Sequence, residues 1–186
     1  MAVTEMKIGG LGGQGVILAG LIMGKAAAIF DKKEATMTQA FGPEARGSAC
    51  SAQVIVSDST ILYPYVTRPQ VLVTMSQDAY NKFSPEMAEN GLLLIEEELV
   101  KVTNPPKGAK VYGIPATRIA EELGRKMVAN IVMLGCLAAL DQSVSCEALK
   151  QAVCSSVPKG SEELNIKAFA RGFAYGQQLL ESPSLP

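Results

Sequence analysis

The sequence feature that most constrains the fold of this 186-residue chain is a cluster of glycines close to its start. The stretch KIGGLGGQGVILAG covers residues 7–20, and five of the seven positions from Gly9 to Gly15 are glycine. Within it, the glycines at positions 10, 12 and 15 match the pattern G-x-G-x-x-G. Glycines in this pattern allow a tight turn and a close approach of the backbone to a ligand, provided that a strand precedes them and a helix follows.

The residues on either side of the glycines fit this context. Met6–Gly10 predicts a short strand, and the stretch from Gly15 to Phe30 predicts a helix rich in small residues, which can lie close to a sheet. The bare amides at the start of such a helix face an anion, and the helix dipole favours negative charge there. A tight turn that holds no ligand is the alternative. The residues predicted to contact an anionic cofactor are Gly10, Gly12, Gly13, Gln14 and Gly15.

A dinucleotide such as NAD needs a further residue, an acidic side chain about 20 residues on, at the end of the second strand. Asp31 and Glu34 have about that spacing, but they stand before or at the start of the second strand, which we expect over Glu34–Gln39. The carboxyl end of that strand, Thr38-Gln39-Ala40, has no carboxylate. Simple NAD binding is therefore disfavoured, and another phosphate-bearing or anionic ligand fits better.

A second loop, FGPEARGS over residues 41–48, follows the second strand directly. In an open α/β sheet, the loops after the first two strands lie side by side, so we expect this loop to meet the glycine loop. Its Arg46 offers a planar fork to phosphate or carboxylate, and Glu44 would orient that fork. An Arg–Glu pair that only orders the loop is the alternative. The residues predicted to join the site from this segment are Thr38, Gly42, Pro43, Glu44 and Arg46.

The rest of the chain alternates predicted strands with predicted helices, which is the pattern of an α/β protein. After the strand at residues 49–57, a turn at Asp58-Ser59 predicts that Ile61-Leu62 forms a hairpin with it, which makes the sheet mixed. From Ala116 onward the pattern is helical, and we expect a single domain over residues 1–186. Further strands are expected at Val71–Met75, Gly91–Ile95 and Lys110–Ile114, and helices within Ser76–Met87, Thr117–Lys126, Asn130–Leu140, Glu147–Val153 and Glu163–Leu180.

Composition excludes several classes of protein. The formal net charge is -1, so no basic excess attracts nucleic acid. The chain has no histidine, which removes the commonest general base and every Ser-His or Cys-His triad. Its four cysteines lie too far apart to suggest a metal or iron–sulfur site, and we expect them to be small buried residues in a reducing cytosol. No segment has the pattern of a signal peptide or membrane span, so a cytoplasmic location is expected.

Two long segments together carry a specific resemblance. GGLGGQGVILAG followed by ATMTQAFGPEARGSACSAQVIVSD resembles the gamma subunit of the 2-oxoacid:ferredoxin oxidoreductases and the equivalent domain III of pyruvate-ferredoxin oxidoreductase. NIVMLGCLAAL at residues 130–140 and NIKAFARGFAYG at residues 165–176 resemble C-terminal segments of that family. The stretches ATMTQ and ACSA are more similar to the 2-oxoglutarate type than to the pyruvate type. Related indolepyruvate subunits usually carry a histidine before the equivalent of Glu44, and this chain has none.

The resemblance implies a Rossmann-like three-layer α/β fold with a mixed, mostly parallel sheet and a helical C-terminal part. It also implies an enzyme complex that decarboxylates a 2-oxoacid on thiamine diphosphate, passes electrons through iron–sulfur clusters to ferredoxin and transfers the acyl group to coenzyme A. In this family thiamine diphosphate, magnesium and the clusters belong to other subunits, and the gamma chain is implicated in placing coenzyme A. We therefore expect the isolated chain to be inactive and to bind the catalytic subunits tightly. Because 48% of its residues are hydrophobic, which leaves room for exposed apolar surface, we also expect it to form a homo-oligomer when alone.

Two other functions stay open at this point. A free-standing dinucleotide-binding enzyme would need an acid after the second strand and a group for proton transfer, and the sequence shows neither. A purely structural assembly subunit would use the same glycine-rich loop for close packing against its partners, without holding a ligand.

Overall fold

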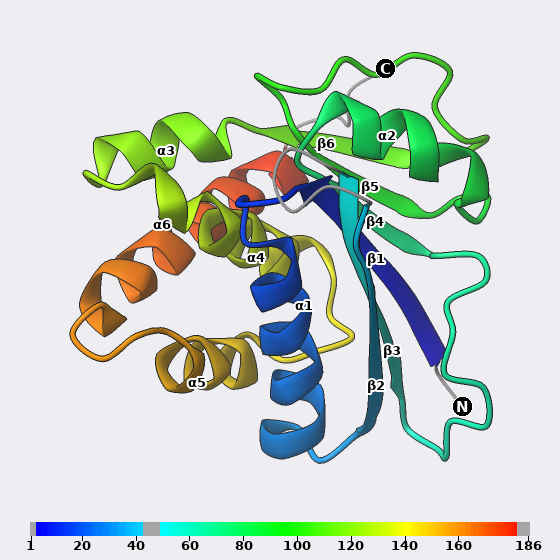
Figure 1. The fold of residues 1–186 in the computed structure, drawn as a ribbon, viewed down its shortest axis with the longest axis horizontal. Coiled ribbons are helices and arrows are strands. Elements are labelled where there is room, and N and C mark those ends of the chain that lie inside the picture. Colours follow the sequence, from blue (N-terminus) through cyan, green and yellow to red (C-terminus); the bar gives the residue numbers. More distant parts are fainter. Residues whose placement is uncertain (1–2, 43–48, 182–186) are drawn as a thin grey trace.

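The computed structural model describes residues 3–42 and 49–181, which form a six-stranded sheet with helices on both faces (Figure 1). The strands are β1 Val3–Leu11, β2 Glu34–Ala40, β3 Ala49–Ser57, β4 Val71–Thr74, β5 Leu92–Glu96 and β6 Lys110–Ile114. The helices are α1 Val16–Lys25, α2 Gln77–Phe83, α3 Ala116–Glu122, α4 Ala129–Leu140, α5 Cys146–Ser156 and α6 Glu162–Glu181. A π-helical turn over Ala26–Phe30 extends α1, and 3-10 turns cover Ser84–Glu86 and Lys126–Val128. The predicted α/β fold with a helical C-terminal part is confirmed.

The strands lie in the order β2-β3-β1-β4-β5-β6. Strands β1, β4, β5 and β6 pair in parallel, whereas β3 runs antiparallel to both of its neighbours. The mixed, mostly parallel sheet is therefore as predicted. The chain leaves β1 toward β2 and β3 on one side and returns to β4 on the other, so the strand order reverses between β1 and β4. In open α/β sheets, ligands bind at such a reversal, outside the carboxyl ends of the strands.

The predicted hairpin between β3 and Ile61-Leu62 is wrong. β3 already has β1 on one side and β2 on the other, so neither of its edges is free. The actual hairpin joins β2 to β3, with Met37 opposite Val54. Residues 58–70 form bends and irregular chain without a strand, and Leu62 is 92% exposed. A local turn signal predicted the end of β3 correctly, but it could not show which strand pairs with which.

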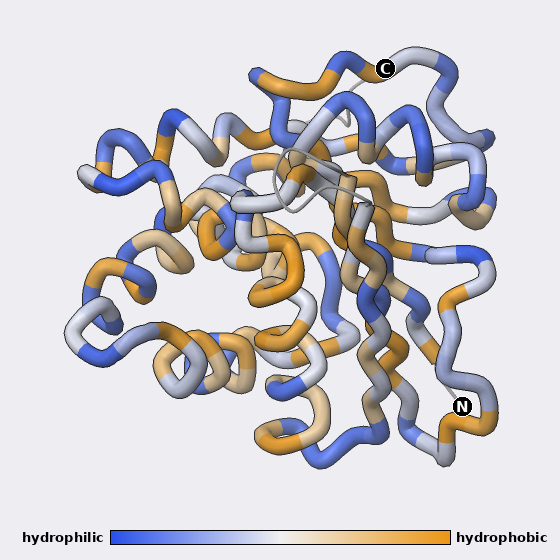
Figure 2. Tube along the Cα trace, viewed as in Figure 1, coloured by the Kyte–Doolittle hydropathy of each residue, from blue (hydrophilic) through white to orange (hydrophobic). Residues whose placement is uncertain are grey.

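Helices cover the two faces of the sheet unequally (Figure 1). α1 and α4 to α6 lie on one side, and the larger hydrophobic core fills the space between them and the strands. α2 lies on the other side, over a smaller core that includes Leu72, Tyr80, Phe83 and Leu93. Figure 2 shows the same division, with apolar residues along the strands and the inner turns of α1 and α4. The three layers hold the carboxyl ends of the parallel strands together at one edge.

Helix α4 is almost wholly buried, as its apolar sequence predicts. Its residues 129–138 are all buried. The backbones of α6 and α4 are in direct contact where the helices cross, because Gly135 on α4 and Gly172 and Gly176 on α6 carry no side chains. A Cβ at Gly172 would lie only 2.0 Å from the carbonyl oxygen of Val132. The two helices therefore form a closely packed pair behind the larger core.

The four cysteines occupy different environments. Cys50 and Cys136 are buried, as predicted, and burial raises the pKa of the Cys136 thiol to about 12. Cys146 is half-buried and Cys154 is exposed, so the prediction of buried thiols is wrong for these two. Both lie on α5, an amphipathic helix whose outer face also accepts small residues.

Candidate functional site

The glycine loop connects the carboxyl end of β1 to the start of α1. The N–H of Gln14 donates to the carbonyl oxygen of Leu11 at 3.1 Å and closes a four-residue turn. Gly13, the third residue of that turn, has a φ of +97°, a conformation that favours glycine. A Cβ added at Gly13 would have no atom within 4 Å. Gly12 is half-buried and, unlike Gly13, is not among the glycines with positive φ. Position 13 therefore needs glycine for its backbone and leaves open space beside it.

Gly15 is constrained by a buried side chain from α4 as well as by its own backbone. It forms the N-cap of α1 with a φ of +74°. The Nδ2 of Asn130 donates to the carbonyl oxygen of Gly15 at 3.1 Å, and Asn130 is only 3% exposed. A Cβ at Gly15 would stand 2.4 Å from that Nδ2. The end of the glycine loop is thereby fixed to the first turn of α4.

The side chain of Gln14 belongs to the framework of the loop. Its Oε1 accepts a hydrogen bond from the N–H of Leu11 at 2.7 Å, and its Nε2 donates to the carbonyl oxygen of Met75 at 2.8 Å. These two bonds tie the end of β1 to the residue that follows β4. Gly10 makes room for them, since a Cβ there would lie 2.6 Å from the Gln14 Oε1. Gly10 and Gln14 thus shape the loop from the inside.

A cavity of about 310 Å³ opens beside this loop at the carboxyl edge of the sheet. Gly13, Gln14 and Met75 line one side of it, so it lies where the strand order reverses between β1 and β4. The start of α1 is next to these residues. The first N–H groups of a helix have no partner within the helix, so this side of the cavity favours an anion.

The opposite walls combine apolar and polar side chains from later segments. Leu99 and Met127 line the cavity although they are 45% and 83% exposed, and Ala129 lines it from the start of α4. Lys126 adds a positive charge. Its Nζ lies 3.7 Å from the Glu121 carboxylate in an exposed pair, and such pairs contribute little stability. The cavity therefore offers a cationic group beside apolar surface, as ligand sites commonly do.

Thr117 also lines the cavity, and it is linked to a buried acid. Its hydroxyl donates to Oε2 of Glu96 at 2.8 Å. Glu96 is the last residue of β5 and is wholly buried, and this burial raises the pKa of its carboxyl. Sequence reasoning missed both residues, as it missed Leu99, Lys126 and Met127. The available signal was their position at or just after the carboxyl end of a parallel strand, or just before the buried helix α4.

The second predicted loop lies only partly within the described residues. Pro43, Glu44 and Arg46 fall outside them. Gly42 and Thr38 are described, and the Thr38 Oγ1 is buried without a hydrogen-bond partner among the residues that the structure describes.

The first two strands do not end side by side as predicted, because β3 lies between β1 and β2. The segment after β2 instead returns as the antiparallel strand β3. The first residue of β3, Ala49, is paired with Leu11, where the glycine turn begins. The second loop therefore leads directly into the residue next to the glycine turn.

Asp31, considered above as a ribose ligand, has a structural contact at the far end of α1. Its carboxylate accepts hydrogen bonds from the N–H and the Oγ of Ser145, at 2.7 and 2.6 Å, and Ser145 caps α5.

We expect Asp31→Ala to lower the free energy of unfolding by roughly 1 kcal/mol, because Ser145 then loses both hydrogen bonds that hold it at the start of α5. Urea denaturation measures this loss. Glu34→Ala, at an exposed neighbouring position, is the control and should change stability by less than about 0.5 kcal/mol; equal losses would contradict the anchoring role.

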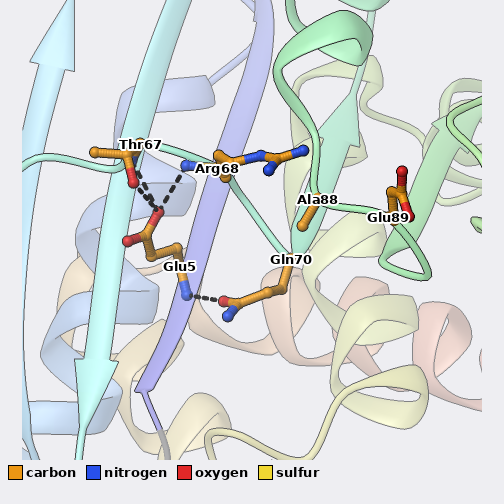
Figure 3. A pocket seen from close by; sticks show the side chains of 6 residues that line it. All are labelled: Glu5, Thr67, Arg68, Gln70, Ala88 and Glu89. Atoms are coloured by element: carbon orange, nitrogen blue, oxygen red, sulfur yellow. Dashed lines mark hydrogen bonds between the residues drawn. The ribbon is translucent and has the colours of Figure 1, made fainter.

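A second cavity, of about 510 Å³, lies at the opposite edge of the sheet, near the start of β1 (Figure 3). There, Oε2 of Glu5 accepts hydrogen bonds from the backbone N–H groups of Thr67 and Arg68, at 2.8 and 2.9 Å. Figure 3 shows the Arg68 guanidinium directed away from Glu5, toward Ala88 and Glu89. Glu5 thus holds the segment that leads into β4. Because this edge carries the amino ends of the parallel strands, the candidate site remains the cavity beside the glycine loop.

The fold, with its glycine loop and a cavity where the strand order reverses, is that of a Rossmann-like α/β protein. The chain belongs to the pyruvate ferredoxin/flavodoxin oxidoreductase family, whose model matches residues 5–175. It is 48% identical over 177 residues to the 2-oxoglutarate synthase subunit KorC of Methanocaldococcus jannaschii, a match that covers 94% of this chain and 95% of that protein.

Two solved structures are similar to this one. The gamma subunit of a keto/oxoacid ferredoxin oxidoreductase from Geobacter sulfurreducens superposes with a TM-score of 0.87 at 38% identity, over 96% of this chain and 98% of that one. A 2-oxoglutarate:ferredoxin oxidoreductase from Magnetococcus marinus, solved with 2-oxoglutarate, coenzyme A and succinyl-CoA bound, shares the fold with a TM-score of 0.85. Its identity is 22%, over 96% of this chain and 32% of that one.

These relatives confirm the resemblance to the gamma subunits, and the chain is a subunit of an oxidoreductase complex that acts on 2-oxo acids. None of the helices in residues 3–42 and 49–181 is long and apolar enough to cross a membrane. The same residues contain no group of three or more His, Cys, Asp or Glu side chains that could hold a metal ion.

Proposed function

We propose that this chain is the non-catalytic gamma subunit of a 2-oxoglutarate:ferredoxin oxidoreductase and that it helps to place coenzyme A for acyl transfer. The observation that carries the proposal is the open glycine turn beside a cavity at the strand-order reversal. Coenzyme A has phosphate groups, which suit the helix start next to Gly13. It also has an elongated arm with apolar and polar parts, which suits a cavity walled by Leu99, Met127 and Lys126.

The relatives support the same substrate class. The KorC relative is a subunit of a 2-oxoglutarate synthase, and it matches nearly the full length of this chain. The Magnetococcus enzyme, which shares the fold, was solved with coenzyme A and succinyl-CoA bound. A glycine loop that receives phosphate groups fits a reaction in which coenzyme A accepts the acyl group.

The side chains of this subunit would bind and orient rather than react. The chain has no histidine to act as a general base, and its described residues hold no cluster of metal ligands. We propose that partner subunits hold thiamine diphosphate, magnesium and the iron–sulfur clusters, and that ferredoxin receives electrons from those subunits. This division of labour predicts no turnover by the isolated chain.

An assembly role is the second candidate function. Leu99 and Met127 are exposed apolar side chains beside the glycine loop, and a partner chain could cover them in the complex. In that case, the open space beside Gly13 would receive a partner's backbone rather than a phosphate.

Valine at position 13, compared with valine at a control glycine, distinguishes an effect on ligand binding from an effect of backbone strain alone. We expect Gly13→Val to raise the KM for coenzyme A about tenfold or more in the reconstituted complex, because the side chain fills the space that the phosphates approach. Gly160→Val is the matched control, since Gly160 also has a positive φ of +87° and open space around it, but it lies before α6. It carries the same strain and should change this KM by less than about twofold. Equal effects at the two positions would contradict ligand placement.

Arg46, although outside the described residues, belongs to the same proposal. We expect Arg46→Ala to raise the KM for coenzyme A by about tenfold, because it removes a charge-assisted contact to an anion. Arg46→Lys should restore only part of the loss, since a fork becomes a point charge. Reduction of the enzyme by 2-oxoglutarate alone should stay normal. If Arg46→Ala instead dissociates the complex and leaves the KM for coenzyme A unchanged, the assembly role is correct.

A further inference from the structure

The buried carboxylate of Glu96 is not explained by the binding of phosphate at the glycine loop. Glu96 is 0% exposed at the end of β5. Its Oε1 accepts a hydrogen bond from the N–H of Glu98 at 3.2 Å, and its Oε2 accepts one from the hydroxyl of Thr117 at 2.8 Å. Among the ion pairs of the described residues, none includes Glu96. A buried carboxylate without a cation normally costs stability, so its position beside the cavity needs another explanation.

The hydrogen bond to Glu96 fixes what Thr117 can offer to a ligand. A threonine hydroxyl has one proton to donate and two lone pairs that accept. Both oxygens of Glu96 act as acceptors, so the proton of Thr117 is committed to the buried carboxylate. Thr117 therefore presents only an acceptor to the cavity that it lines.

The two sides of the cavity consequently differ in the hydrogen bonds that they offer to a ligand. On one side, Gly13 lies next to the positive end of the α1 dipole. On the other side, Lys126 adds a positive charge, while the Glu96 carboxylate lies behind Thr117 and holds its proton. Glu98 is paired with Arg118 at 3.0 Å. Phosphate is attracted to the first side, and at Thr117 it meets a hydroxyl oxygen that has no proton left to donate to it. A ligand is thus oriented with its anionic part at the glycine turn and a neutral donor group at Thr117.

We propose that Glu96 is a positioning residue that fixes Thr117 as a hydrogen-bond acceptor for an N–H group of coenzyme A. This inference rests on the proposed function, in which coenzyme A occupies the cavity. The amide N–H groups of the pantetheine arm and the amino group of adenine share the required chemistry. The pair thereby determines which way the ligand lies and rejects analogues that lack a donor at this point.

Two substitutions at Thr117 test the acceptor. Thr117→Val keeps the shape of the side chain but removes the oxygen, and we expect it to raise the KM for coenzyme A about five- to tenfold in the reconstituted complex. Thr117→Ser keeps the oxygen and should stay within about twofold of the native complex. The KM for 2-oxoglutarate should not change in either variant. Equal losses in Thr117→Val and Thr117→Ser would show that the effect does not follow the hydroxyl oxygen and would overturn the proposal.

Glu96→Gln tests the positioning role with a readout that a merely structural residue would not give. The single carboxamide oxygen turns to the fixed N–H of Glu98, so the Nε2 faces Thr117 and the hydroxyl proton turns into the cavity. We expect the KM for coenzyme A to rise about fivefold, while the melting temperature is kept or raised because a buried charge is removed. An unchanged KM would overturn the proposal. If Glu96→Gln fails to fold, the two Thr117 variants still decide.

Inhibition by ADP locates the donor group. If Thr117→Val raises the KM for coenzyme A but leaves the inhibition constant of ADP unchanged, the donor is an amide of the pantetheine arm. If the variant raises both constants, the donor is the adenine amino group. Either result supports the acceptor role of Thr117. If Gly13→Val raises the KM for coenzyme A and Thr117→Val does not, this inference fails and the proposed function stands. If neither variant raises it, both fail.

Discussion

Gly172→Ala is expected to lower the free energy of unfolding by about 3 kcal/mol, one of the largest effects of any single methyl group in this chain. The new Cβ would stand 2.0 Å from the carbonyl oxygen of Val132 and 3.0 Å from the N–H nitrogen of Cys136. Both are backbone atoms of the buried helix α4, so no side chain can rotate away. α6 must move outward, and the packing between the two helices loosens along their length.

Gly24→Ala is the control, because it makes the same chemical change in a helix where space is available. A Cβ at Gly24 would have Met37 Cβ at 3.9 Å as its only neighbour within 4 Å. Alanine favours helix over glycine, so this variant should be more stable by roughly 0.5–1 kcal/mol. Urea denaturation of the purified chain measures both changes, and they should have opposite signs. A loss at Gly172 below about 1 kcal/mol would mean that the helices do not cross this closely.

The secondary structure of this chain was largely predictable from local pattern. Strands β4 and β5 are buried on both faces, which leaves short runs of Val, Leu and Ile in the sequence. α4 is surrounded by protein, and its sequence is apolar on nearly every side. The close crossing of α4 and α6 was not predictable. Glycines at 172 and 176 share one face of a helix, but the sequence does not say which backbone approaches them.

Strand pairing was the main failure, and its cause is topological. Both β2 and β3 were predicted as strands, β3 from partial alternation and the β-branched run Val54-Ile55-Val56. The position of β3 between β1 and β2 depends on how the chain turns after Ala40. In a dinucleotide-binding fold, β1 usually has a parallel neighbour on both sides, whereas here only β4 is parallel to it. Here the antiparallel return brings Ala49, rather than the end of β2, next to Leu11.

The candidate site was predictable only on the side built from one continuous segment. The motif predicted the glycine turn, because positive φ at Gly13 and Gly15 is a local property of the backbone. The other wall comes from Leu99, Thr117 and Lys126, which the sheet brings to the same edge from segments far along the chain. No local pattern links them to the glycines. The sequence therefore predicted an anion-binding turn but not the side chains that line the cavity opposite it.

Gly15→Ala is expected to cost about 3 kcal/mol, whereas Gly13→Ala should cost only about 1 kcal/mol. Both positions have positive φ, so both variants carry the same kind of backbone strain. At Gly13 the added Cβ meets nothing within 4 Å, but at Gly15 it stands 2.4 Å from the Nδ2 of Asn130. Asn130 must then shift, and its buried amide loses the hydrogen bond to the Gly15 carbonyl.

A double-mutant cycle with Asn130→Ala isolates this contact. Asn130→Ala removes the amide that the new Cβ would meet, so the second methyl group then costs little beyond backbone strain. We expect the double variant to be more stable than the sum of the single losses predicts, by about 1–2 kcal/mol. Guanidinium denaturation of the four proteins gives this difference. Strict additivity would show that the strain at Gly15 lies in its own backbone and that the loop does not depend on α4. Losses that are less than additive would instead show that α4 holds the first turn of α1 in place, and with it the amides that we propose for ligand binding.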